Sequence, residues 1–448
     1  MGIIYPLFSK DTIWQVGIAR VDITPNDTLW LAGYAARDHA AEGTLHQLWA
    51  KAFAVKDQYG NRGVIITTDL LGLPKNISDN IIARCKEKYQ LERSQIILSS
   101  SHTHTGPVLR ESLYIIYSLS DEDIKRIEDY SRQLVNNIVH IIGQAFDNMI
   151  SAELYAANGV VRFQVNRRNN DVKTLSAQSD LNGPNDFAVP ILRARRTDGK
   201  LLAIVFGYAC HPTVLNSYKW SGDYPGFAQL ALEDKFPGTT ALFFQGCGAD
   251  QNPLPRRSIN LAMQYGQELA AAVERIINDK LEPLSADLRT GCAEIELSFA
   301  STPNRLKLEK MANESSVGYQ QRWAKKMLDN LIKGKPSLKS YPYPIQIWKL
   351  GGQSIFALGG EVVVDYAIML KRIFGQDVFV MGYCNDVMGY IPSVRILREG
   401  GYEGSTSQIV YDLPSTWKAD IETRIIQGVL QLAEKTGIDI PESSLISN

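Results

Sequence analysis

Residues 95–107 read QIILSSSHTHTGP, a short apolar run that leads into two histidines, His102 and His104. An apolar run of this length, closed by polar residues and a Gly-Pro pair, predicts a buried strand, so both histidines stand at a strand exit. Side chains at positions i and i+2 point to the same side of a strand, and they can enter one cleft. Such a pair indicates a metal or catalytic site, although a hydrogen-bonded loop element is the alternative.

A third histidine occupies the same kind of position. His211 lies just beyond the apolar run at 201–206, which again has the length of a strand. The chain contains only six histidines. A metal site draws its nitrogen ligands from separate parts of the chain, so the recurrence strengthens the metal or catalytic interpretation.

Two later apolar runs also end in polar side chains. The run at 354–358 leads to Glu361, and the run at 378–381 leads through a loop to Tyr390. In open α/β sheets, ligands bind in the crevice beyond the strand ends, so these side chains are expected to converge there with the histidines. Two histidines, a carboxylate and a phenolate would suit zinc.

Hydrophobic periodicity indicates an α/β fold. Strand-like runs at 63–69 and 95–100 flank a helical stretch at 77–89, whose start Asn76 or Ser78 could cap. Further helices are predicted at 121–146, 259–277, 304–333, 362–374 and 415–434. Strands between these helices complete the α/β pattern.

Length and charge limit the function classes. A chain of 448 residues could form two or three average domains, but it has no Pro/Gly/Ser-rich linker, and the candidate ligands extend from position 102 to 390. That spread favours one large catalytic unit. Lys plus Arg number 47 and Asp plus Glu 48, so the charge balance favours neither nucleic acid nor an acidic membrane surface as a partner.

The cysteines and the apolar segments exclude other classes. Five widely spaced cysteines without a CxxC pair indicate neither a disulfide framework nor a thiolate zinc cage. No segment approaches the ~20 apolar residues of a membrane span, so no integral membrane segment is expected. The compartment is left open: periplasmic or secreted if a signal peptide has been removed, and otherwise cytoplasmic. The oligomeric state is open as well.

Several other polar residues are predicted to lie outside the site. His140 falls off the apolar stripe of the 121–146 helix and is expected to face solvent, and His39 and His46 are expected at the surface or at the rim of the cleft. The Lys-rich stretch at 307–335 most simply marks a solvated helix face, although such a helix could also cover a site.

The ordered set of motifs resembles the neutral/alkaline, non-lysosomal ceramidase family, specifically its N-terminal catalytic domain. The resemblance spans most of the chain and is carried by LAGY (31–34), LWAKAF (48–53), Thr68-Asp69, SSHTHTGP (100–107), Asn166-Arg167, HPT (211–213), GGE (359–361), Tyr390 and YEG (402–404). It implies a mixed β-sheet core flanked by helices. We expect a single catalytic domain over residues 1–448, with its core at about 14–436 and, unlike the family pattern, no C-terminal immunoglobulin-like domain.

The resemblance further implies a Zn²⁺ site. Its ligands would be the first histidine of the HTH motif, the histidine of the HP dipeptide, the glutamate of the GE pair and a tyrosine; these are His102, His211, Glu361 and Tyr390. The alternatives are that Glu361 is a carboxylate favoured by a helix N-terminus and that Tyr390 is an ordinary half-buried aromatic residue.

The same resemblance gives His104, Arg167 and Tyr402 contacts with the scissile carbonyl and its developing oxyanion. A cation and two directional hydrogen-bonding groups can stabilise negative charge there, while zinc polarises the carbonyl or activates a water molecule. The alternative for Arg167 is a surface cation beside Arg168.

One position departs from the family pattern. Ceramidases carry a GDVSPN-like loop whose serine is usually treated as the nucleophile, whereas this chain reads GADQNP at 248–253, with Asn252 at the position of the serine. An amide cannot accept an acyl group, but it can orient a substrate or a water molecule.

Three hypotheses follow. The first is a zinc-dependent hydrolase that cleaves an amide (N-acyl) bond of a small-molecule or lipid-like substrate by means of metal-activated water. The second is a hydrolase of an ester or a carbohydrate-linked substrate. The third is a metal-binding relative without catalytic activity.

Overall fold

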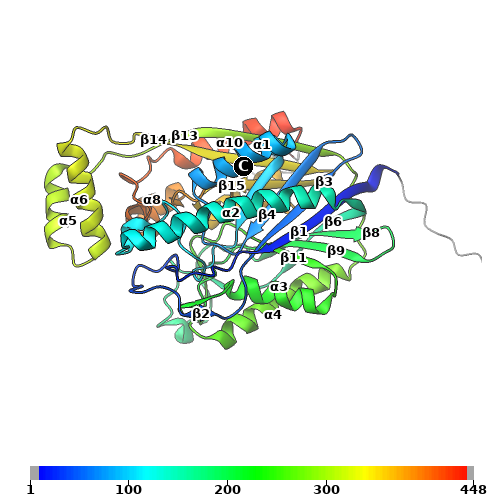
Figure 1. The fold of residues 1–448 in the computed structure, drawn as a ribbon, viewed down its shortest axis with the longest axis horizontal. Coiled ribbons are helices and arrows are strands. Elements are labelled where there is room, and N and C mark those ends of the chain that lie inside the picture. The colour runs from blue at the N-terminus through cyan, green and yellow to red at the C-terminus, as the bar shows by residue number, and fades with distance from the viewer. Residues whose placement is uncertain (1–9, 441–448) are drawn as a thin grey trace, which may run out of the picture.

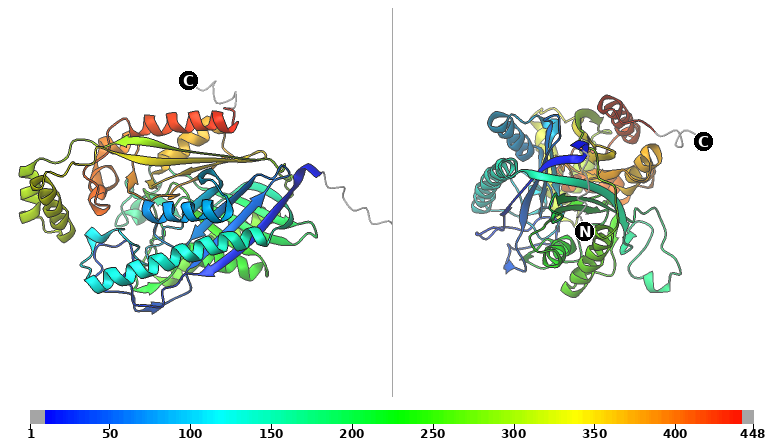
Figure 2. Two further views of the ribbon diagram at one scale, coloured as in Figure 1. Left: turned by 45° about the horizontal axis from the view of Figure 1, so that its top comes forward. Right: turned by 90° about the vertical axis from the view of Figure 1, so that its right-hand side faces the viewer.

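Two β-sheets pack face to face in the computed structural model, which describes residues 10–440, and helices cover their outer faces (Figures 1 and 2). The larger sheet has eight strands in the order β11-β9-β8-β6-β1-β3-β4-β5. Its members are β1 (Ile13–Asp22), β3 (Trp49–Lys56), β4 (Arg62–Thr68), β5 (Ile96–Ser100), β6 (Ile150–Val160), β8 (Ala188–Arg196), β9 (Leu201–Tyr208) and β11 (Thr240–Gln245). The β4-β5 and β9-β11 pairs are parallel and the other pairs antiparallel, so the sheet is mixed, as expected.

The second sheet has four strands in the order β13-β14-β15-β17, namely β13 (Leu288–Ser298), β14 (Ser340–Leu350), β15 (Gln353–Leu358) and β17 (Phe379–Met381). Three two-stranded ladders complete the strands: β2 (Gly43–Thr44) with β10 (Lys219–Trp220), β7 (Gln164–Asn166) with β12 (Gln251–Pro253), and β16 (Glu361–Val362) with β18 (Tyr390–Ile391).

The main helices are α1 (Lys75–Tyr89), α2 (Asp121–Asp147), α3 (Asp223–Lys235), α4 (Ile259–Ile277), α5 (Arg305–Glu314), α6 (Gly318–Ile332), α7 (Val364–Phe374), α8 (Val394–Glu399), α9 (Ser407–Val410) and α10 (Ile421–Thr436). The outer face of the eight-stranded sheet packs on α1 and α2 at one end and on α3 and α4 at the other. The outer face of the four-stranded sheet packs on α7 and α10. The result is four layers: helices, sheet, sheet, helices.

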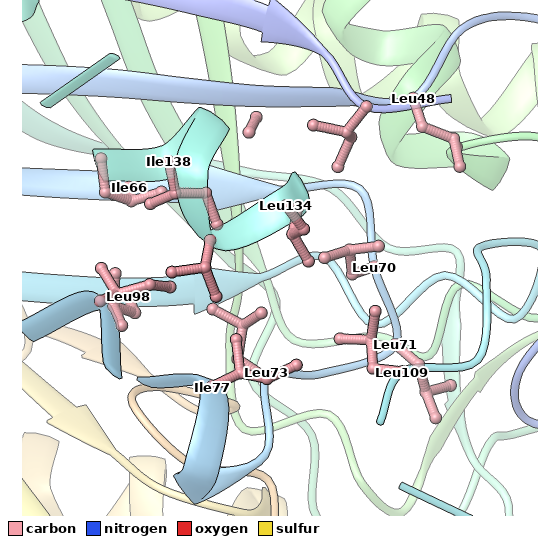
Figure 3. Packing of buried hydrophobic residues seen from close by; sticks show 14 of the residues in the cluster. Leu48, Ile66, Leu70, Leu71, Leu73, Ile77, Leu98, Leu109, Leu134 and Ile138 are labelled. Carbon is pink, nitrogen blue, oxygen red and sulfur yellow. The ribbon is translucent and has the colours of Figure 1, made fainter. Parts of the chain in front are cut away.

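The alternation of side chains between the two faces of each strand explains these layers. In β5, Ile96 and Leu98 belong to the cluster with α1 and α2, whereas Ile97 belongs to the cluster between the two sheets. Since successive side chains point to opposite faces, a strand buried on both sides reads as an unbroken apolar run. Figure 3 shows the helix-side cluster, in which Ile66 of β4 and Leu98 face Ile77 of α1 and Ile138 of α2.

The order of the strands alone does not explain how distant strand ends meet, because β5 and β11 lie at opposite ends of the eight-stranded sheet. The segment after β17 joins them. The Gly382 N–H donates to the carbonyl of Gln245 in β11, and the Asn385 N–H donates to the carbonyl of Leu98 in β5. Strand β9 pairs with β11. The residues that follow β5 and β9 therefore lie close together.

Three predicted helix boundaries were wrong. Helix α1 begins after Pro74, which has the extended backbone of an N-cap residue, whereas Asn76 and Ser78 lie inside the helix and do not cap it. Val362, the first residue of the helix expected at 362–374, belongs to β16 and Val363 is the N-cap, so α7 begins at Val364. The helix expected at 415–434 begins only at Ile421, since Trp417 forms a β-bridge with Phe299.

The helix expected at 304–333 is divided into α5 and α6. Ser315 has an extended backbone, and its hydroxyl accepts the N–H of Val317 and donates to Gln320, so side-chain hydrogen bonds replace the helical ones at the break. The two helices form a hairpin that projects from one end of the molecule (Figure 1). Leu306 and Ile332 are 76% and 73% exposed, which agrees with a solvated hairpin.

Within residues 10–440, no helix combines the length and apolar character that a bilayer span requires.

The contact between β1 and α2 leaves no room for a side chain at Gly17. A Cβ atom placed there would lie 1.7 Å from the carbonyl oxygen of Ala145 in α2. Gly17→Ala should therefore separate strand and helix and lower the free energy of unfolding by about 1–3 kcal/mol. Urea unfolding followed by circular dichroism measures this. Gly352→Ala is the matched control, because a Cβ there meets no atom within 4 Å, and equal unfolding midpoints for the two variants would contradict the packing.

Candidate metal centre and active-site pocket

Three buried electron-pair donors converge at the strand ends. Oε2 of Glu361 lies 3.2 Å from Nε2 of His102 and 3.2 Å from Nε2 of His211. The three side chains are between 1% and 4% exposed. His102 follows β5, His211 follows β9 and Glu361 begins β16, so the structure brings together three of the four predicted metal ligands around one point.

Hydrogen bonds on the far side of each ring fix the imidazole tautomers. Nδ1 of His102 lies 2.6 Å from the carbonyl oxygen of Leu71, and Nδ1 of His211 lies 2.8 Å from that of Gly248. A carbonyl oxygen only accepts, so each Nδ1 carries a proton, and Nε2 is the ring nitrogen that faces Glu361. This outward hydrogen bond is the usual support of a metal-binding histidine.

The ionisation states of His211 and Glu361 are compatible with a bound cation. Burial lowers the pKa of His211 to about 4, so its imidazole is neutral near pH 7. Burial alone would raise the pKa of Glu361, but the adjacent His102 and His211 hold it well below its usual range, and the group is a carboxylate. Oε2 of Glu361 accepts no hydrogen bond from any residue in 10–440. Two ring nitrogens that face an unsatisfied carboxylate oxygen fit a metal ion such as Zn²⁺.

Tyr390 lies at the edge of this donor set. Strands β16 and β18 are parallel, and their register places Tyr390 directly beside Glu361. The Tyr390 hydroxyl is 3.5 Å from Nε2 of His211 and accepts a hydrogen bond of 3.2 Å from Nη2 of Arg167. Tyr411 donates to Oε1 of Glu361 and fixes the other side of the carboxylate. The geometry thus admits Tyr390 as a fourth ligand, but less closely than the other three.

His104 also approaches the cluster. Its Nε2 lies 3.3 Å from Nε2 of His102, and one ring nitrogen from each of His102, His104 and His211 fits within 4.8 Å. Burial lowers the pKa of His104 well below its usual value, so this ring is neutral too. Its Nδ1 is buried and has no hydrogen-bond partner in residues 10–440. His104 can therefore serve as a nitrogen ligand or as a neutral base beside the metal.

The backbone at His102 has an unusual conformation. Its φ is +64°, a region that non-glycine residues seldom adopt. The N–H of His102 donates to the carbonyl of Leu70, and the N–H of Ser101 donates to that of Thr68, so the loop after β4 holds the turn in place. Strained backbone of this kind is concentrated at functional sites.

A pocket of about 650 Å³ opens beside the cluster. It is lined by Gly33, Tyr34, His104, Arg167, Arg168, His211, Thr213, Asn252, Arg256, Arg257, Tyr390, Gly401, Tyr402 and Glu403. All four residues predicted to act on the substrate, namely His104, Arg167, Asn252 and Tyr402, are among these. All of 304–333 is described, and none of it lines this pocket, so the hairpin does not cover the site.

Arg167 is not a free surface cation. Its Nε donates to Glu403 at 2.7 Å, and its guanidinium lies 5.7 Å from the centre of the Tyr402 ring. Burial alone would lower the pKa of Arg167, but Tyr390 and Glu403 raise it, so the charge is retained. The pocket therefore holds a fixed positive charge next to the candidate ligand Tyr390.

Asn252 forms part of the pocket wall. It lies in β12, which pairs with β7 and places Asn252 opposite Val165. The side chain is largely buried, and its Oδ1 accepts a hydrogen bond of 3.4 Å from the Thr213 hydroxyl. This strand pairing also positions Arg167, because β7 ends one residue before it.

The remaining histidines lie elsewhere, as predicted. His140 is exposed on α2, and His39 is exposed between Asp38 and Glu42. Nε2 of His46 lies 3.0 Å from the hydroxyl of Ser221, away from the pocket lining.

Sequence reasoning missed several site residues. Glu403 and Tyr34 lie inside motifs quoted above, but nothing in those motifs indicated an ion pair or a pocket wall. Arg256 and Arg257 follow Asn252 on the same loop, and that proximity was an available signal. Tyr411 had no sequence signal, because its contact with Glu361 joins residues 50 positions apart.

Comparisons with known proteins show which family the chain is similar to. The family model described as "Neutral/alkaline non-lysosomal ceramidase, N-terminal" matches residues 14–254, which is more than half of the chain. Neutral ceramidase B of Dictyostelium discoideum is 26% identical over 267 residues, covering 55% of this chain and 36% of that protein. Neutral ceramidase of Drosophila pseudoobscura pseudoobscura is 24% identical over 236 residues, covering 50% and 32%. The chain thus spans about a third of the length of these curated relatives.

The fold is that of a solved ceramidase. The crystal structure of neutral ceramidase from Pseudomonas aeruginosa superimposes with a TM-score of 0.74 at 18% identity, covering 97% of this chain and 78% of that one. This match confirms the predicted mixed α/β architecture. Together with the family model, it leads to one conclusion: the chain belongs to the neutral/alkaline non-lysosomal ceramidase family.

Proposed function

We propose that this protein is a zinc-dependent hydrolase that cleaves an amide (N-acyl) bond, and that residues from about 14 to 436 act as one catalytic unit. The observation that carries the proposal is the convergence of His102, His211 and Glu361 at 3.2 Å beside a pocket that contains a fixed arginine. The family supports the reaction class, because ceramide, on which its named members act, is an N-acyl compound.

His102, His211 and Glu361 would hold the metal, with Tyr390 as the fourth ligand. Bound zinc supplies Lewis acidity and makes water a better nucleophile near neutral pH. Hydrolysis then adds one water molecule across the C–N bond and releases a carboxylic acid and an amine. Neutral His104 is placed to take a proton from the attacking water and to pass it to the leaving nitrogen.

Arg167 and Tyr402 would stabilise the developing oxyanion. The ion pair with Glu403 fixes the guanidinium of Arg167 before the substrate arrives, so little reorganisation is needed as charge develops. Asn252 can neither attack nor accept an acyl group, so it is assigned a hydrogen-bonding role toward substrate or water.

A hydrolysis screen of the zinc-loaded protein on ceramides, N-acyl amino acids, simple esters and N-acetylated sugars tests the reaction class. Amide cleavage supports the proposal. Cleavage of esters alone would favour an esterase, and inactivity on every substrate would favour a non-catalytic relative.

Metal content tests the ligand assignment. Purified protein should contain about one zinc ion per chain after dialysis, measured by elemental analysis. His102→Ala and His211→Ala should each lose that ion, because each removes one of three closely spaced donors. His140→Ala, which alters an exposed histidine on α2, should keep it. Full occupancy in both ligand variants would show that the metal binds elsewhere.

His104→Ala separates the two possible roles of that residue. If His104 transfers protons, the variant should keep its zinc and lose turnover by about 10²–10⁴. Elemental analysis and initial rates on the same preparation measure both quantities. Loss of zinc would place His104 among the ligands, and normal turnover would make it a structural residue.

Mass spectrometry and the Asn252→Ser variant test whether water attacks the amide carbonyl directly. If water attacks the carbonyl directly, intact-protein mass spectrometry of a reaction stopped during turnover should show no covalent adduct. Asn252→Ser should gain little ceramide hydrolysis, because a serine outside attack geometry contributes little to the rate. A trapped acyl adduct on the unmodified protein would contradict direct attack.

A further inference from the structure

Two arginines in the active-site pocket have no acidic partner. Arg256 and Arg257 lie on the loop after β12, and both line the pocket together with His104 and Asn252. Among residues 10–440, no carboxylate lies within ion-pair distance of either guanidinium. The pocket's other arginines differ in this respect: Arg167 pairs with Glu403, and Arg168 pairs with Glu399 and Glu403.

The hydrogen bonds of the arginine pair use only neutral acceptors. Nη1 of Arg256 donates to the Thr213 hydroxyl at 3.2 Å. Nη1 of Arg257 donates to the Tyr34 hydroxyl at 2.8 Å and to the Thr213 carbonyl at 3.4 Å. Asp223 interacts electrostatically with Arg257 but forms no ion pair with either guanidinium, and its carboxylate oxygens accept the N–H groups of Leu215 and Tyr224. Most of the guanidinium donors therefore remain available to a ligand.

The arginines are held in place against mutual repulsion. Burial lowers the pKa of Arg256, and the positive charges of Arg257 and Arg167 lower it further, so an anion at this place would be favoured. Arg257 has a φ of 87°, which is unusual for a bulky residue, and its guanidinium lies 5.0 Å from the centre of the Tyr34 ring. A strained backbone and a ring contact restrict this side chain more than an ordinary surface arginine.

The rest of the lining is polar or aromatic. The pocket contains no leucine, isoleucine, valine, methionine or phenylalanine, and its larger apolar surfaces are the rings of Tyr34, Tyr390 and Tyr402. Long alkyl chains bind by burying apolar area, which a pocket without aliphatic side chains offers only sparingly. This lining does not suit the two hydrocarbon chains of a ceramide.

We propose that the amide substrate is hydrophilic and carries an oxyanion, either carboxylate, sulfonate or phosphate, which Arg256 and Arg257 bind while the amide lies beside His104 and Arg167. The proposal rests on the amidase function stated above and names its substrate class. Guanidinium groups recognise these oxyanions through paired, charge-assisted hydrogen bonds, which explains why two adjacent arginines point at the pocket without an internal counter-ion.

Matched substrates test the proposal. N-acetylglycine, N-acetyltaurine and N-acetyl-O-phosphoethanolamine carry the three oxyanions, N-acetylglycinamide is the neutral counterpart, and C2-ceramide is the lipid counterpart. The best anionic substrate should have a kcat/KM about 10–100-fold above that of N-acetylglycinamide, since hydrogen bonds between charged groups are the strong ones. The identity of that substrate tells which oxyanion is recognised.

The Arg256→Gln/Arg257→Gln double variant should bring this ratio close to one, because it removes both positive charges that would bind the oxyanion. The corresponding double lysine variant should keep a large part of the preference, because it keeps the charge. Arg162→Gln, an exposed arginine outside the pocket, is the matched control and should change nothing. An unchanged ratio in the double glutamine variant, or C2-ceramide as the best substrate of the unmodified protein, would overturn the proposal.

A binding measurement separates this inference from the amidase function. Titration calorimetry with the three anionic probes requires no turnover. Binding of a probe to the unmodified protein and its loss in the double glutamine variant would support the arginine site, even if no amide were hydrolysed and the amidase function had failed. Equal affinity in both proteins, or no binding to the unmodified protein, would overturn the site. Thermal unfolding checks that each variant is folded, and the single variants replace the double variant if it is not.

Discussion

The site depends on one buried constraint, the approach of Oε2 of Glu361 to the Nε2 atoms of His102 and His211 at 3.2 Å. Hydrogen bonds on the opposite edge of each ring fix the orientation of the two imidazoles, because the two Nδ1 atoms donate to the carbonyls of Leu71 and Gly248. The two Nε2 atoms and the ionised carboxylate face one another, and a metal ion between them would satisfy all three. The loops after β4 and β11 are therefore as necessary as the residues that would bind the metal.

The two packed sheets make this approach possible. The histidines follow strands of the eight-stranded sheet, whereas Glu361 follows β15 of the four-stranded sheet, and the shared apolar core between the sheets fixes their relative position. The segment after β17 contributes hydrogen bonds to both β5 and β11 and brings the two ends of the large sheet toward each other. Ligands from positions 102 to 361 thus meet because of sheet packing, not because of closeness in sequence.

Sequence reasoning succeeded where the signal was local. Apolar runs predicted the strands β5, β9 and β15, after which His102, His211 and Glu361 stand, and α4 has the predicted bounds 259–277. It failed where long-range contacts decided the outcome. The pairing of β16 with β18 includes Val362, the first residue of a predicted helix, and the Arg167–Glu403 ion pair joins residues 236 positions apart. The family resemblance supplied the roles of Tyr390 and Tyr402, which periodicity alone did not distinguish from other tyrosines.

We propose above that His102, His211 and Glu361 hold a metal ion. A crystal structure of the zinc-loaded protein, with an anomalous difference map collected at the zinc absorption edge, tests it most directly. The account predicts one anomalous peak between the three side chains, about 2.0–2.2 Å from Nε2 of His102, Nε2 of His211 and a carboxylate oxygen of Glu361. A strong peak elsewhere, or a peak at the histidines with Glu361 outside bonding distance, would contradict it.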